Sequence, residues 1–149
     1  MAEQNTGTDT NTNANIAAVE KFLFALRDED LDTADSLLDD NLVYQNVGFS
    51  TIRGRQRTMR LFAAMKQRQS LGFDVKFHRV AGDGDTVLTE RTDVLVFGPV
   101  RVIFWVCGVF ELSDGRITLW RDYFDTVDMA KGLVRGLAAA VVPALQRTF

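Results

Sequence analysis

Two carboxyl groups and one arginine fall among apolar neighbours in stretches whose residues alternate as in β-strands. Alternation puts Asp122 on the strand face that carries Trp120 and Phe124. Upstream, the same period of two places Arg91 and Asp93 together on one face. A carboxylate in apolar surroundings costs desolvation free energy unless it is paired or protonated. Two such carboxyls that share an arginine could therefore act as a general acid and a general base.

Simpler structural roles are open for the same residues. Arg91 and Asp93 could form an ion pair at a sheet edge, and Asp122 could be a buried carboxylate that backbone donors satisfy. Tyr44 and Asn46 share one face of another expected strand, and they could be a core phenol and a turn-bonding amide. Five polar groups that could all face inward are nevertheless many to satisfy without a function. We therefore predict that they form one site.

Composition narrows the classes of function. The 149 residues are 46% hydrophobic and 25% charged, which is typical of a soluble globular domain. A net charge of −3 gives no basic excess to attract phosphates, so we expect no nucleic-acid partner. One cysteine (Cys107) and one histidine (His78) allow no internal disulfide and none of the usual zinc ligand sets. We therefore expect chemistry without a metal.

The two ends of the chain differ in character. Residues 1–15 are rich in Asn and Thr and lack the basic start and apolar core of a secretory signal. We predict a disordered tail over 1–15, a single domain over 16–149 and a cytoplasmic location. The apolar run 136–145 is too short to span a bilayer, which takes about 20 residues. It could instead cover the core, close a pocket or contact a second subunit.

Helical periodicity dominates the first half of the sequence and its end. Apolar residues recur at helical spacing from Ile16 to Leu26, and Asp30 is placed to cap a short second helix. The expected helices cover about 14–27, 31–38, 55–68 and 128–142. In the last of these, Met129, Leu133 and Leu137 form an apolar stripe, with Ala140 beyond them. We expect this helix to line or cover a pocket.

Strand patterns fill the region between the third and fourth helices. The expected strands cover 42–47, 73–78, 86–97, 100–112 and 117–125. Turn residues at 82–85 and 113–116 predict hairpins, and 100–112 is apolar on both faces, so it should be central. Helices followed by mainly antiparallel hairpins indicate an α+β domain in which a bent sheet wraps around the helices.

Three short motifs carry a resemblance to a known family. Tyr44-Gln45-Asn46, Glu90-Arg91-Thr92-Asp93 and Trp120-Arg121-Asp122-Tyr123-Phe124-Asp125, in this order, resemble the limonene-1,2-epoxide hydrolases over about 16–125. The resemblance implies a cystatin-like or NTF2-like cone, with a curved mixed sheet wrapped around N-terminal helices and a deep apolar pocket. It also implies a homodimer and a reaction without a metal or a cofactor.

The resemblance also assigns roles. It implies that Asp122 accepts a proton from water, that protonated Asp93 donates to the epoxide oxygen, and that Arg91 bridges the two. Tyr44 and Asn46 would help to hold the water. The product would be a vicinal diol, formed in one step without a covalent intermediate from a bulky apolar epoxide of terpene, fatty-acid or sterol type. The apolar setting of Asp122 alone favours the acid role for it, so its assignment as the base rests on the resemblance. The residues themselves leave the two roles open.

Other functions fit the same architecture. Ketosteroid-isomerase-like and polyketide-cyclase-like enzymes share the cone, and so could a non-catalytic module that binds lipids or polyketides. An isomerase could work with Asp93 or Asp122 alone and Tyr44 as a donor. An arginine placed to serve two carboxyls favours hydrolysis.

Overall fold

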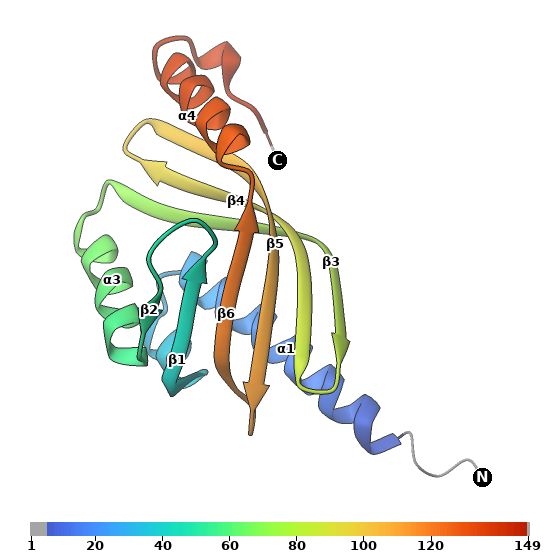
Figure 1. The fold of residues 1–149 in the computed structure, drawn as a ribbon. Coiled ribbons are helices and arrows are strands. Elements are labelled where there is room, and N and C mark those ends of the chain that lie inside the picture. Colours follow the sequence, from blue (N-terminus) through green and yellow to red (C-terminus); the bar gives the residue numbers. More distant parts are fainter. Residues whose placement is uncertain (1–5, 149) are drawn as a thin grey trace.

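The computed structural model describes residues 6–148, which form four α-helices around one sheet (Figure 1). The helices are α1 (Thr6–Arg27), α2 (Leu31–Ser36), α3 (Arg55–Gln67) and α4 (Thr126–Val141), with a short 3₁₀ turn η1 (Pro143–Leu145) after the last. The strands are β1 (Leu38–Asn46), β2 (Ile52–Arg53), β3 (Leu71–Asp83), β4 (Thr86–Phe97), β5 (Val100–Ser113) and β6 (Arg116–Phe124). Within residues 6–148, no helix combines the length and apolar character that crossing a membrane requires.

The six strands form one mixed sheet in the order β2-β1-β6-β5-β4-β3. β1 runs parallel to β6, and every other neighbouring pair is antiparallel. The long strands β3 to β5 curve strongly, so that their ends near α4 lie across the rest of the sheet (Figure 1). β5 lies between β6 and β4, as its apolar faces predict. This order places β4 and β6, which carry the candidate carboxyls, on either side of β5.

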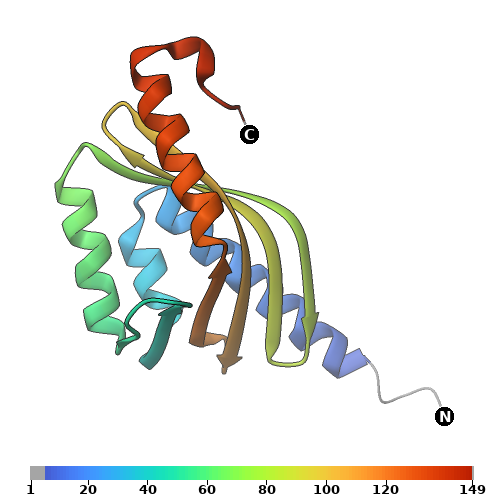
Figure 2. The same ribbon diagram turned by 45° about the horizontal axis from the view of Figure 1, so that its top comes forward.

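The main core fills the space between α1, α2 and the sheet. Val19, Phe22 and Leu23 of α1 are fully buried because helical spacing puts them on one side. From the sheet, Phe110 and Ile117 are fully buried against them. α1 thus closes the inner face of the curved sheet (Figure 2).

The first helix begins earlier than the sequence predicts. α1 starts at Thr6 rather than near Ala14, so the predicted disordered tail overlaps ten residues that are helical; residues 1–5 lie outside the described residues. Polar side chains of this segment bind the β3–β4 turn, since Asn15 Nδ2 donates to the Gly84 carbonyl at 3.0 Å. The Gly84 N–H in turn donates to Thr12 Oγ1 at 3.1 Å. Tertiary hydrogen bonds therefore outweigh the low helix propensity of Asn and Thr.

The first strand also begins earlier than predicted. β1 starts at Leu38, whereas the sequence suggests that Asp39 to Asn41 separate a helix from a strand that begins at Leu42. Leu38 pairs with Ile117 of β6, and both side chains are fully buried. Burial of this pair extends the strand through three polar residues.

The last helix packs through its small residues rather than its large ones. Of the predicted apolar stripe, Met129 packs against a buried cluster of β5, whereas Leu133 and Leu137 are 44% and 52% exposed. Gly132, Gly136 and Ala139 face β5 instead. A Cβ at Gly132 would lie 2.8 Å from the Ile103 carbonyl oxygen. The helix therefore approaches the strand backbone closely and leaves its long side chains in solvent.

Candidate active site

Arg91 of β4 lies at the centre of the polar groups inside the cone. Its side chain is fully buried. Nε donates to Asp93 Oδ1 at 2.9 Å, and Nη2 donates both to Asp93 Oδ2 at 3.1 Å and to Asp122 Oδ2 at 2.6 Å. Asp93 and Asp122 are 5% and 4% exposed. One guanidinium thus bridges two buried carboxyls, as the strand pattern suggests.

The bridge spans β5 because that strand carries a glycine at the crossing point. In the ladder, Gly108 pairs with Thr89 of β4 on one side and with Asp122 of β6 on the other. A Cβ at Gly108 would lie 2.9 Å from Asp122 Oδ1 and would collide with Arg91 Nη1. Gly108 is not among the predicted site residues, although an isolated glycine within an apolar strand is a signal of close approach.

Tyr44 and Asn46 reach the same site from β1. The parallel pairing of β1 with β6 sets Asn46 beside Asp122 and Tyr44 beside Trp120. Asn46 Nδ2 donates to Tyr44 Oη at 2.8 Å, and the Tyr44 ring stacks on Trp120 with centroids 4.1 Å apart. Because the hydroxyl oxygen accepts this bond, its own proton stays available to a molecule in the cavity.

Four of the five predicted residues line a cavity of about 350 Å³, and Arg91 lies behind them. Apart from these residues and Ser50, the walls are apolar. They comprise Leu26, Phe49, Ile52, Leu61, Phe62, Met65, Phe73, Leu95, Phe104, Val106, Trp120, Phe124 and Met129. A polar end and a large apolar remainder suit a mostly apolar molecule with one reactive polar group.

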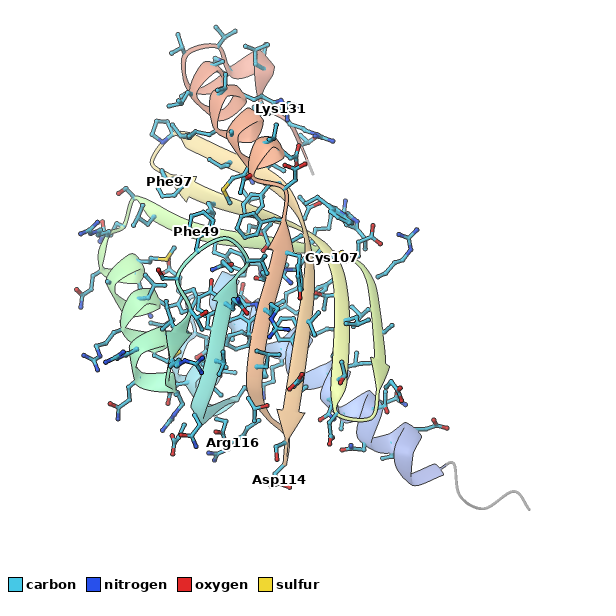
Figure 3. The ribbon with its side chains drawn as sticks, viewed as in Figure 1. Phe49, Phe97, Cys107, Asp114, Arg116 and Lys131 are labelled. Atoms are coloured by element: carbon cyan, nitrogen blue, oxygen red, sulfur yellow. The ribbon has the colours of Figure 1, made fainter. Side chains whose placement is uncertain are left out.

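The loop after β1 and the start of α4 both contribute to the cavity wall. Phe49 is 58% exposed, and its ring stacks with Phe124 at a centroid distance of 6.0 Å. Figure 3 shows Phe49 near the point where β6 leads into α4. α4 contributes Met129 to the lining, whereas Leu133 and Leu137 do not reach the cavity. The expectation that the last helix lines the pocket is therefore right only for its first turn.

Burial controls the protonation of this cluster. Desolvation raises the pKa of Asp93 to about 6, against the opposing charge and hydrogen bonds of Arg91 and with a contribution from the Asp122 charge. Desolvation lowers the pKa of Arg91, but the charges of Asp122 and Asp93 outweigh it and raise that pKa above its usual value. Burial and the Asp122 charge also raise the pKa of Tyr44. Near neutral pH the site thus holds a charged arginine, a neutral phenol and an aspartate that can carry a proton.

Only one carboxyl oxygen of Asp122 accepts a hydrogen bond from Arg91. Its Oδ2 accepts from Arg91, but its Oδ1 is buried and has no hydrogen-bond partner among the residues that the structure describes. An unpaired buried carboxylate oxygen is costly, so a group in the cavity that donates to it would be bound favourably. A water molecule is such a donor.

In the described part of the chain, no three His, Cys, Asp or Glu side chains are grouped so that they could hold a metal ion. The two carboxyls are already paired with Arg91. A reaction that needs no metal or cofactor stays a prediction.

Comparison with known proteins relates the chain to one family. The sequence model of the limonene-1,2-epoxide hydrolase catalytic domain matches residues 13–135. Epoxide hydrolase EphG of Mycobacterium tuberculosis (strain ATCC 25618 / H37Rv) is 64% identical over 131 residues, which cover 88% of this chain and 87% of that protein. The structure of an LEH-like epoxide hydrolase from M. tuberculosis has a TM-score of 0.89 and 62% identity, covering 93% of this chain and 97% of its own.

More distant structures share the fold alone. An NTF2-like protein of unknown function from Cytophaga hutchinsonii ATCC 33406 is 22% identical with a TM-score of 0.65, covering 87% of this chain and 99% of its own. The α+β NTF2-like fold with a mixed sheet, which the resemblance implies, is therefore confirmed, and in the described residues the sheet has six strands.

Proposed function

Because this chain belongs to the limonene-1,2-epoxide hydrolase family and is an epoxide hydrolase, we propose that it opens its substrate by one-step attack of water, with no covalent intermediate. The product is a vicinal diol. Membership of this family sets aside the isomerase, cyclase and non-catalytic alternatives. Two points go beyond family membership. The geometry around Arg91 supports the mechanism, and the apolar cavity supports the substrate class.

The proposed step divides acid and base work between the two carboxyls. A water held by Asn46, Tyr44 and Asp122 attacks one epoxide carbon as Asp122 takes a proton from it. The carbon–oxygen bond on that carbon breaks, and protonated Asp93 donates its proton to the leaving oxygen. Proton transfer from Asp122 back to Asp93 then restores the starting state. Arg91 stays charged throughout and orients both carboxyls.

The surroundings of each carboxyl support one assignment of the two roles, which the sequence leaves open. The raised pKa of Asp93 supports the acid role, because it brings this carboxyl closer to neutral pH, where a fraction of it can carry the proton that an acid donates. The unpartnered Oδ1 of Asp122 supports the base role, because a base must have a free acceptor. Environments that differ in this way are typical of paired catalytic carboxyls.

The observation that carries the proposal is the single buried guanidinium that donates to both carboxyls. We expect Asp122→Asn to lose activity by about 10² to 10⁴ while the protein stays folded, since positioned proton transfer is worth that much. Arg91→Lys should also lose most of its activity, because an ammonium cannot span two carboxylates with a planar fork. Asp83→Asn, on an exposed position of β3, is the matched control.

A single turnover in ¹⁸O water tests the direct attack. The label should enter the diol and never the protein. Labelled Asp93 or Asp122 would establish an ester intermediate and overturn the proposal. Full activity of Asp122→Asn would overturn it as well.

We propose a compact apolar epoxide as the substrate. Apart from its polar end the cavity is apolar, and about 350 Å³ lies at the low end of the roughly 300–1,000 Å³ of small-molecule sites. This volume favours an epoxide of terpene size over the fatty-acid and sterol types that the family resemblance also allows. Rates on matched terpene, fatty-acid and sterol epoxides test this order, and faster turnover of a sterol epoxide would reverse it.

We also propose that the protein is a homodimer. The last helix and the segment after it leave seven large apolar side chains exposed: Val127, Leu133, Val134, Leu137, Val141, Val142 and Leu145. A monomer seldom leaves so many apolar side chains together in water. Covering them with a second copy would remove that cost.

A further inference from the structure

Thr89 binds Nη1 of Arg91, the guanidinium nitrogen that donates to neither carboxyl. It lies two residues before Arg91 on the same face of β4, and it is 3% exposed. Its Oγ1 accepts a hydrogen bond from Arg91 Nη1 at 3.0 Å. All three guanidinium nitrogens therefore have an acceptor, with Nε and Nη2 bound to the carboxyls and Nη1 bound to the hydroxyl.

The neighbouring strand offers this nitrogen no side chain. Gly108 of β5 is the ladder partner of Thr89, and a Cβ there would lie 2.7 Å from the hydroxyl and would collide with Nη1. The hydroxyl and the guanidinium thus pack against bare backbone. Without Thr89, Nη1 would be a charged donor on a fully buried side chain, left short of an acceptor.

We propose that Thr89 is a positioning residue, whose hydroxyl fixes the rotation of the Arg91 guanidinium so that Nη2 stays between Asp93 and Asp122. This inference rests on the proposed function, in which that shared nitrogen orients acid and base. A guanidinium is planar, so any rotation that gives Nη1 a new acceptor moves Nη2 as well. Loss of the hydroxyl would therefore disturb the catalytic geometry and not only the packing.

Three variants separate these effects. Thr89→Val keeps the shape and removes the hydroxyl, whereas Thr89→Ser keeps the hydroxyl. Thr92→Val makes the same change on the opposite face of β4, where the Thr92 hydroxyl contacts His78 at 2.8 Å. For Thr89→Val we expect kcat to fall roughly tenfold to hundredfold with KM little changed, as for loss of one hydrogen bond to a charged group. Thr89→Ser and Thr92→Val should keep kcat.

The pH profile gives a readout that a packing defect would not move. The titratable groups around Arg91 are Asp93 of β4, Asp122 of β6 and Tyr44 of β1. Hydrogen bonds from Arg91 lower the pKa of Asp93, so a guanidinium that is held less firmly lets this pKa rise. The pH above which kcat falls should then be higher in Thr89→Val, and unchanged in Thr89→Ser.

Two results would overturn the inference. One is a Thr89→Val enzyme with the kcat and pH profile of the parent, and the other is a Thr89→Ser enzyme as impaired as Thr89→Val. The Asp122→Asn variant, assayed in parallel, separates this failure from that of the proposed function. If Asp122→Asn is inactive and Thr89→Val is fully active, only the positioning role falls. If Asp122→Asn is active, the proposed mechanism itself falls.

Discussion

Asp93→Asn should change how the stability of the protein depends on pH. The pKa of Asp93 is about 6 in the folded protein, against 3.8 for an unperturbed aspartate. A tenfold change in proton affinity is worth about 1.4 kcal/mol, so the ionised form is about 3 kcal/mol less favourable in the folded protein than in the unfolded chain. Because the folded pKa is the higher one, this contribution to stability is present below about pH 4 and is lost as the pH rises through about 6.

Urea unfolding of the parent and of Asp93→Asn across this range measures the effect. Asparagine cannot titrate, so the variant lacks this step, whereas other titrating groups are common to both proteins. We expect the free energy of unfolding of the variant, minus that of the parent, to increase by about 2.5 kcal/mol between about pH 4 and about pH 8. The absolute difference also contains the altered contact with Arg91, which does not depend on pH in this range. Only the change of this difference with pH tests the reasoning.

A difference in unfolding free energy that does not change with pH would refute this reasoning. It would mean that Arg91 compensates the burial of Asp93 fully, and that Asp93 is ionised throughout this range. The acid role would then lose its electrostatic support. A difference that decreases with pH would mean that the pKa of Asp93 is lowered, which would favour the opposite assignment of acid and base.

Two further predictions concern the last helix. Light scattering should give about twice the chain mass of 16.7 kDa, and Val134→Lys on the exposed side of α4 should give the monomer; a parent protein near 16.7 kDa would contradict the homodimer. Gly136→Ala should destabilise the protein by about 1–3 kcal/mol in urea unfolding. The added Cβ would collide with the Arg101 carbonyl oxygen, and this overpacking outweighs the gain of about 1 kcal/mol in helix propensity. A more stable Gly136→Ala protein would mean that α4 moves away from β5 at little cost.

Local patterns determined much of this protein. Alternation along single strands is enough to place Arg91 with Asp93 and Asp122 with Trp120, because side-chain direction in a strand depends only on the backbone. The same is true of Tyr44 and Asn46 in β1. Turn residues fixed the hairpins between β3 and β6, and helical spacing located α3 to within one residue. The candidate site residues follow from these short-range rules together with the family motifs.

Contacts between distant segments decided the rest. Helix propensity predicts no helix before Ala14, yet hydrogen bonds to the β3–β4 turn extend α1 to Thr6. The packing face of α4 depends on its close approach to the backbone of β5, which favours glycine over the larger residues that periodicity selects.

The chemistry of the site also depends on tertiary structure. The sheet order places β5 between the two carboxyl-bearing strands, and only then does the missing side chain of Gly108 let Arg91 reach Asp122. The raised pKa of Asp93 is a sum over everything that excludes water from it. Sequence therefore determined which groups share a face, whereas the packed structure raises the pKa of Asp93, since desolvation and distance are properties of the whole fold.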